Sequence, residues 1–208
     1  MLDMTRLLAT LLGLLLTLLA VPASALAPTP IPDDFPLTWR IAENESGEQP
    51  TASADGDGVM ELRACDRAAW PLRTGAVSER LAVRATGPEY ADARELVVLR
   101  NARAAVRLVA AVRRTIRACV DRPDAGRQWT EWTGRAAQTG YDSFTFSLTY
   151  STSLGASAIQ VVRVGSGVLV TEASGEGTLG SLRPTIRKQT RVGRHLAASM
   201  CEFARAGC

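Results

Sequence analysis

The spacing of apolar residues along the chain switches twice from a strand period to a helical period, and this switching most constrains the fold. Apolar residues that alternate or run together predict strands at residues 59–65, 80–86, 94–100, 143–151, 156–164 and 168–173. Apolar residues three and four positions apart predict helices at residues 101–120 and about 184–205. The predicted order is therefore three strands and a helix, followed by the same order again.

This βββα-βββα order predicts the α+β class, because strands that follow one another closely pair as antiparallel sheets. The Gly165-Ser166-Gly167 segment is typical of a tight hairpin between the last two predicted strands. Pro123 is placed to end the first helix, and Pro184 fits the first turn of the second. We expect one antiparallel β-sheet with the two long helices packed on one face.

The N-terminal segment, residues 1–25, resembles a secretory signal peptide. The apolar run at residues 7–21 is shorter than the about 20 residues that span a membrane. Ala23 and Ala25 are the small residues that precede a signal peptidase site. We expect cleavage after Ala25, with cleavage after Ala27 as the alternative, and therefore a secreted or extracytoplasmic protein.

The start of translation has two candidates, Met1 and Met4. A start at Met4 would remove Asp3, whose negative charge offsets that of Arg6 ahead of the apolar run. Positive charge in that position is typical of signal peptides.

Cleavage of the signal peptide would leave the protein without a stable membrane anchor. The alternative is that the N-terminal segment is not cleaved and anchors the protein in the membrane.

Four cysteines, Cys65, Cys119, Cys201 and Cys208, all follow the predicted signal peptide. An even number of cysteines in an oxidising compartment predicts two disulfides, for which three pairings exist. Cys201 and Cys208 lie seven positions apart, so their pairing closes a short loop and leaves Cys65 for Cys119. Zinc and redox-active alternatives are disfavoured because no Cys-x-x-Cys pair occurs.

The predicted organisation has three parts. Residues 1–25 form the signal peptide, residues 26–58 form a linker and exposed loop rich in Pro and Gly, and residues 59–208 form a single α+β domain. Asp55 and Asp57 resemble part of a calcium loop, but the carboxylate that would close such a loop is missing. We expect no metal and no cofactor.

The charge of the chain excludes a strongly basic nucleic-acid-binding protein. Lys and Arg number 24 against 21 Asp and Glu, for a net charge of +3, and all the basic residues except Lys188 are Arg. Seven of these arginines lie between Arg100 and Arg122. Binding of anionic envelope polymers is one reading of this group, and the favoured reading is the solvated face of a helix.

Four short motifs stand out: Ile31-Pro-Asp-Asp-Phe-Pro-Leu37, Cys119 at the end of the first helix, Val161-Val-Arg-Val-Gly-Ser-Gly-Val-Leu-Val170, and Met200-Cys-Glu-Phe203 with Cys208. Together they resemble secreted actinobacterial proteins related to the extracellular sensor domain of PknH-type serine/threonine kinases. The resemblance implies a disulfide-linked α+β module with a cleft for an unidentified ligand. It implies no catalytic residues.

The segment Trp129-Thr-Glu-Trp132 is the candidate ligand-facing wall. Glu131 lies between Trp129 and Trp132 in an expected loop that joins the two halves of the chain. Aromatic rings beside a carboxylate are typical of sugar-binding surfaces, and one such carboxylate would serve a glycosidase. The alternative is that both tryptophans pack this loop against the sheet, since Trp is usually buried.

No catalytic set is assembled by the sequence. His195, the only histidine, falls off the apolar stripe of the second predicted helix, and no Gly-x-Ser-x-Gly motif frames a serine nucleophile. The glycines of residues 175–180 lack the lysine of a phosphate-binding loop.

We therefore expect an exported, non-catalytic ligand-binding or sensor-like module that recognises a small envelope ligand or an extracellular protein. The alternative is an exported hydrolase of envelope glycans or esters that uses Glu131 or His195.

Overall fold

The order of strands and helices is close to the predicted one. A computed structural model describes residues 27–59, 62–65, 67–70, 76–120, 126–134, 137–151, 154–204 and 207–208, so the predicted signal peptide and Pro123 lie outside the described residues. The elements are β1 (Arg63–Ala64), β2 (Arg67–Ala68), β3 (Val77–Gly87), β4 (Tyr90–Leu99), α2 (Ala102–Val120), β5 (Arg127–Trp132), β6 (Asp142–Tyr150), β7 (Gly155–Val164), β8 (Gly167–Glu176), α3 (Leu182–Ser199) and the 3₁₀ helix η2 (Met200–Phe203).

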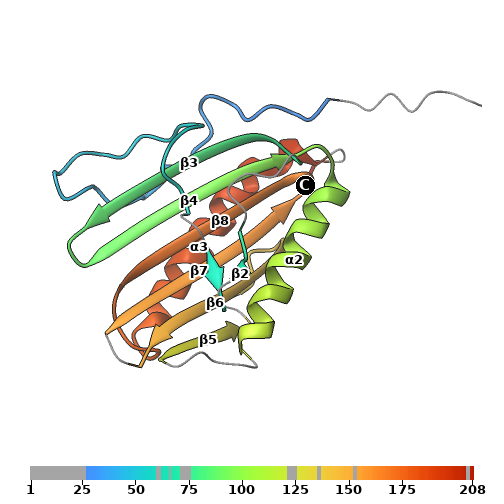
Figure 1. Ribbon diagram of the computed structural model, residues 1–208. Helices are drawn as coiled ribbons and strands as arrows, with labels where there is room; N and C mark the ends of the chain where they lie inside the picture. The colour runs from blue at the N-terminus through green and yellow to red at the C-terminus, as the bar shows by residue number, and fades with distance from the viewer. Residues whose placement is uncertain are drawn as a thin grey trace, which may run out of the picture.

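Six of these strands form one antiparallel sheet in the order β3-β4-β8-β7-β6-β5, as Figure 1 shows. The predicted α+β class, antiparallel sheet and two long helices are confirmed. Of the strand expected at residues 59–65, residues 60 and 61 lie outside the described residues, and Arg63–Ala64 form β1, which pairs with β2. The segment expected as a loop around Trp129 is instead the edge strand β5, paired with β6 over its whole length.

The two helices cover opposite faces of the sheet, so the expectation that both pack on one face is wrong. On β7, Ile159 and Val161 pack in the core cluster that contains α2, whereas Val162 and Val164 pack in the cluster that contains α3. Successive strand residues point to opposite faces, so this alternation places one helix on each face. Figure 1 shows α2 in front of the sheet and α3 behind it. Both faces of the central strands are therefore buried, which explains their nearly continuous apolar sequence.

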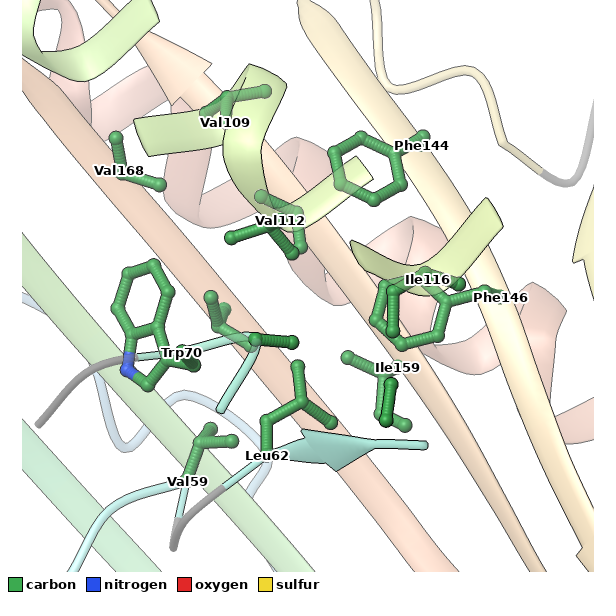
Figure 2. Packing of buried hydrophobic residues seen from close by; sticks show 14 of the residues in the cluster. Val59, Leu62, Trp70, Val109, Val112, Ile116, Phe144, Phe146, Ile159 and Val168 are labelled. Carbon is green, nitrogen blue, oxygen red and sulfur yellow. The ribbon is translucent and has the colours of Figure 1, made fainter. Parts of the chain in front are cut away.

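The core on the α2 face is rich in aromatic and branched side chains. Val109, Val112 and Ile116 of α2 lie over Phe144 and Phe146 of β6 (Figure 2). On the other side of the same core, the segment around the β1–β2 hairpin contributes three buried side chains, Val59, Leu62 and Trp70. The hairpin therefore acts as a second cover for this face beside α2.

A disulfide joins these two covers. Cys65, which follows β1, pairs with Cys119 in the last turn of α2, with 5.7 Å between the Cα atoms. Cys201 of η2 pairs with Cys208, with 5.1 Å between the Cα atoms. Both predicted disulfides are confirmed, and the first links segments 54 positions apart that share one face of the sheet.

The core on the α3 face includes part of the segment predicted as a linker. Phe35, Leu37 and Ile41 are buried there beside Val192 and Leu196 of α3. We call residues 31–41 the strap. Further along, Ser53 forms a bridge with Ala82 on the outer edge of β3. Within the segment expected as a Pro-rich linker, the strap packs against this core because apolar residues lie between and after its prolines.

Beneath α3, a row of buried polar side chains crosses four neighbouring strands. Arg94 of β4, Thr171 of β8, Gln160 of β7 and Thr145 of β6 are cross-strand partners, and all four are fully buried. The Gln160 amide donates to Thr145 Oγ1 at 3.1 Å and to Thr190 Oγ1 of α3 at 3.4 Å. This network ties α3 to the sheet through hydrogen bonds as well as apolar contacts.

The network explains a glycine in the middle of α3. A Cβ at Gly193 would lie 2.1 Å from Gln160 Oε1. We expect Gly193→Ala to lower the free energy of unfolding by about 1–3 kcal/mol, because the buried amide cannot move without losing its partners. Urea unfolding would measure this change.

The control is the same substitution in a Gln160→Ala background. There the close contact is gone, and alanine should become neutral or stabilising by up to about 1 kcal/mol through its higher helix propensity. Stabilisation by Gly193→Ala in the wild-type background would contradict this close packing.

Candidate functional site

The three predicted wall residues do not form one surface. Trp129 is 4% exposed, and its ring packs against Phe146 with 5.5 Å between ring centroids. The pairing of β5 with β6 places Trp129 and Glu131 on the α2 face and Trp132 on the α3 face. Trp129 is therefore a core residue, and the idea of two tryptophans flanking a carboxylate on one side is wrong.

Glu131 and Trp132 nevertheless line the same cavity, at the edge of the sheet. This edge cavity has a volume of about 670 Å³. Its other lining residues come from both helices, from the β5–β6 connection and from the start of β6: Arg113, residues 133–134, residues 137–141, Ser143, Phe144 and Arg194. Because β5 is the last strand of the sheet, side chains from both faces reach this edge.

Two guanidinium groups belong to the lining, one from each helix. Arg113 of α2 lies over the ring of Phe144, with 4.4 Å from its Cζ to the ring centroid. Its Nη2 donates to the carbonyl of Ser143 at a long 3.5 Å. Arg194 of α3 donates through Nη2 to the carbonyl of Gln138 at 3.1 Å. Both arginines are thus held against the wall of the cavity by one polar contact each.

The carboxylate of Glu131 is engaged by a third arginine. Arg117 Nε and Nη2 donate to its two oxygens at 2.8 Å and 3.2 Å. The Arg117 side chain is 60% exposed, so we treat the pair as an orienting contact with little effect on stability. Glu131 is the only acidic side chain among the described lining residues, and its charge is already balanced.

Hydrogen bonds order the β5–β6 connection around the cavity. Ser143 Oγ donates to the carbonyl of Ala137 at 2.7 Å and accepts from Thr139 Oγ1 at 3.0 Å. Trp132 Nε1 donates to Ser147 Oγ at 2.8 Å, which fixes the indole at the edge of the sheet. Gly140 has a φ of 93°, a conformation that side-chain-bearing residues rarely adopt, so a glycine is required at this turn.

His195, the other candidate for chemistry, does not line the edge cavity. Its ring stacks on Trp39 of the strap, with 3.8 Å between centroids and 21° between planes. The side chain is exposed, as expected from its place off the apolar stripe. Its described contact is therefore with the strap.

Further hollows lie elsewhere on the surface of the described residues. The first, of about 370 Å³, lies beside the first turns of α3 and is lined by residues that include Asp92, Thr185 and Lys188. The second, of about 680 Å³, lies at the start of α2 near Arg100 and Glu202. Neither contains a residue of the predicted wall. We call the first the α3 pocket.

The two arginines of the edge cavity carry little signal in the sequence. Arg113 belongs to the arginines interpreted as the solvated face of α2, although it lies one helical turn from the buried Val109 and Ile116. The available signal was position, since Arg113 adjoins the apolar stripe. Arg194 carried no comparable signal, because its role depends on the β5–β6 connection reaching α3.

None of the helices within the described residues is long and apolar enough to cross a membrane. The described residues also contain no group of three or more His, Cys, Asp or Glu side chains positioned to hold a metal ion.

Comparisons with known proteins include a distant structural similarity. No protein-family model matches the chain, and no curated protein matches it. Among solved structures, the chain is similar to the crystal structure of the extracellular domain of PknH from Mycobacterium tuberculosis, with 14% identity and a TM-score of 0.43. The match covers 68% of this chain and 82% of that chain. A similarity of this size assigns neither a family nor a function.

Proposed function

We propose that this protein is an exported, non-catalytic ligand-binding or sensor-like module of the bacterial cell envelope, whose ligand binds in the edge cavity. The observation that carries the proposal is the convergence of Arg113, Glu131, Trp132 and Arg194 on one hollow of about 670 Å³. Hollows of that size that collect a few polar groups beside aromatic rings are typical of small-molecule sites.

Export is supported by the two disulfides and by the predicted signal peptide. Disulfides persist in oxidising compartments and are rare in the cytosol. The Cys65–Cys119 and Cys201–Cys208 pairs account for all four cysteines. These two features together support an extracytoplasmic location.

The hydrolase alternative is less well supported by the cavity. Glycosidases of the usual type place two carboxyl groups across the bond that is cleaved. The described lining supplies one, Glu131, whose two oxygens both accept from Arg117. His195 stacks on Trp39 instead of facing a serine in the cavity. Binding without turnover is therefore the function that these contacts favour.

Equilibrium dialysis against a soluble hydrolysate of bacterial envelope glycans tests the proposal, with mass spectrometry to read what is retained. We expect saturable retention by the wild-type protein. The exposed Thr133 lines the edge cavity, and Thr133→Trp should reduce retention by roughly tenfold because the indole fills the space. The matched control is Thr185→Trp, which places the same bulk in the α3 pocket and should leave retention unchanged.

The masses of the retained compounds separate the two functions. Compounds returned unchanged support a binding module, whereas compounds shortened by the wild-type protein and left intact by Glu131→Gln would establish the hydrolase. Retention that is lost in Thr185→Trp and kept in Thr133→Trp would move the site to the α3 pocket. Thermal unfolding of both variants would check that each is folded.

A further inference from the structure

The edge cavity carries an excess of positive charge, and this excess indicates what its ligand must bring. Among the described lining residues, the charged side chains are Arg113, Glu131 and Arg194. Arg117 already neutralises Glu131 through two hydrogen bonds. The two remaining guanidinium groups are therefore not balanced by any acidic side chain of the described lining.

Arg113 is the arginine whose guanidinium has the less complete set of hydrogen bonds. Its Nε is buried and has no hydrogen-bond partner among the described residues. Its contact with the ring of Phe144 holds the guanidinium in place but accepts no directed hydrogen bond. A buried N–H without an acceptor is costly, and more so when it belongs to a charged group. Because this Nε is closed to solvent, a ligand oxygen in the cavity is met by the terminal Nη groups of the same guanidinium.

Arg194 complements Arg113 from the opposite face of the sheet. It comes from α3, and its described hydrogen bond, to the carbonyl of Gln138, uses one of the five N–H groups of a guanidinium. Two guanidinium groups from different helices therefore line the same hollow. Arginine suits anion binding because its planar N–H pairs match the oxygens of carboxylate, sulfate and phosphate.

We infer that the edge cavity recognises an anionic group on its ligand, carboxylate, phosphate or sulfate, with Arg113 and Arg194 as the two charge contacts. This inference rests on the proposed function and specifies its ligand. Trp132 and Phe144 provide apolar surface for the body of the ligand beside the charged group. The lining thereby favours a compact ring or chain that carries an acidic substituent.

A matched pair of sugars tests the charge requirement directly. Glucuronate and glucose differ by one carboxylate, and inorganic phosphate provides a second anion. Each is titrated into the purified protein while NMR follows the Nε–H signals of the arginine side chains. We expect glucuronate and phosphate to shift the signals of Arg113 and Arg194, and glucuronate to bind roughly tenfold more tightly than glucose.

Substitutions assign the effect to these two residues. Arg113→Gln and Arg194→Gln should each weaken glucuronate binding by roughly tenfold, the value expected for a hydrogen bond to a charged group. Arg107→Gln is the control, because Arg107 is exposed on the same helix and does not line the cavity. Added salt should weaken binding to the wild-type protein more than to either cavity variant.

Equal binding of glucose and glucuronate would overturn the inference, as would the failure of both anions to shift the two arginine signals. These outcomes differ from a failure of the proposed function. Neutral glycans retained by the wild-type protein and lost in Thr133→Trp would keep the binding module and remove only the anionic ligand.

Discussion

Replacing Arg94 with Met should lower the free energy of unfolding by about 3–5 kcal/mol, the largest effect that we expect from a single substitution. Arg94 is fully buried in β4. Burial lowers the pKa of its guanidinium, and the nearby carboxylate of Asp92 raises this pKa in part. A buried cation of this kind destabilises the fold unless its partners are in place.

Those partners attach the strap to the sheet. Arg94 Nη1 donates to the carbonyls of Leu37 and Trp39 at 2.8 Å and 2.6 Å, and Nε lies 3.4 Å from Asp92 Oδ1. Methionine would leave both strap carbonyls without this donor. It would also leave the buried Asp92 facing Lys188 at 3.5 Å, whose side chain is 53% exposed.

Urea unfolding measures the loss, and hydrogen exchange of residues 35–41 locates it. Arg163→Met is the control, since the Arg163–Asp142 pair is partly exposed and should contribute less than about 1 kcal/mol. Adding Asp92→Asn to Arg94→Met should recover part of the stability by removing the uncompensated charge. If the Arg94→Met protein kept wild-type stability and its strap amides stayed protected from hydrogen exchange, the strap would be held by its apolar residues alone.

Removing the Cys65–Cys119 disulfide by a double substitution to Ala should cost about 4 kcal/mol, against about 2.5 kcal/mol for Cys201–Cys208. The difference follows from loop length, because the first disulfide closes 54 positions and the second seven. The first also fastens the β1–β2 hairpin over Val59, Leu62 and Trp70. Losing it should therefore expose part of the α2-face core.

Urea unfolding of the two double variants gives the comparison, and the part of the tryptophan fluorescence at low denaturant that Trp70→Phe removes reports early release of the hairpin. The Cys201→Ala/Cys208→Ala protein serves as the internal control, since η2 retains buried Met200 and Phe203 without the disulfide. Equal losses in the two variants would contradict the loop-length account.

The periodicity of the sequence predicted most of the elements because apolar alternation is a local property. β4, α2, β7 and β8 each carry a long apolar pattern, and the structure places them within a few residues of the predicted bounds. β5 was missed because its six residues are mostly polar and aromatic, and its strand conformation depends on pairing with β6. Edge strands of this kind gain their structure from the neighbour they pair with.

The faces covered by the helices depend on long-range packing, which a local pattern does not encode. Arg94 illustrates the limit. In sequence it begins an apolar run, and only the strap carbonyls, 55 and 57 positions away, explain why a charged residue is buried there. The same holds for the site, since Glu131 and Trp132 were identified from their own sequence context, whereas Arg113 and Arg194 meet only across the folded sheet edge.

The most direct test of the central proposal is an amide chemical-shift map of the isotopically labelled protein titrated with the envelope-glycan hydrolysate. A ligand in the edge cavity should produce saturable shifts confined to residues 131–134, 137–144 and the neighbourhoods of Arg113 and Arg194. The hydrolysate should keep its composition throughout. Shifts gathered instead around the α3 pocket, or a steady change in the hydrolysate with no saturable shift at the sheet edge, would contradict the proposal.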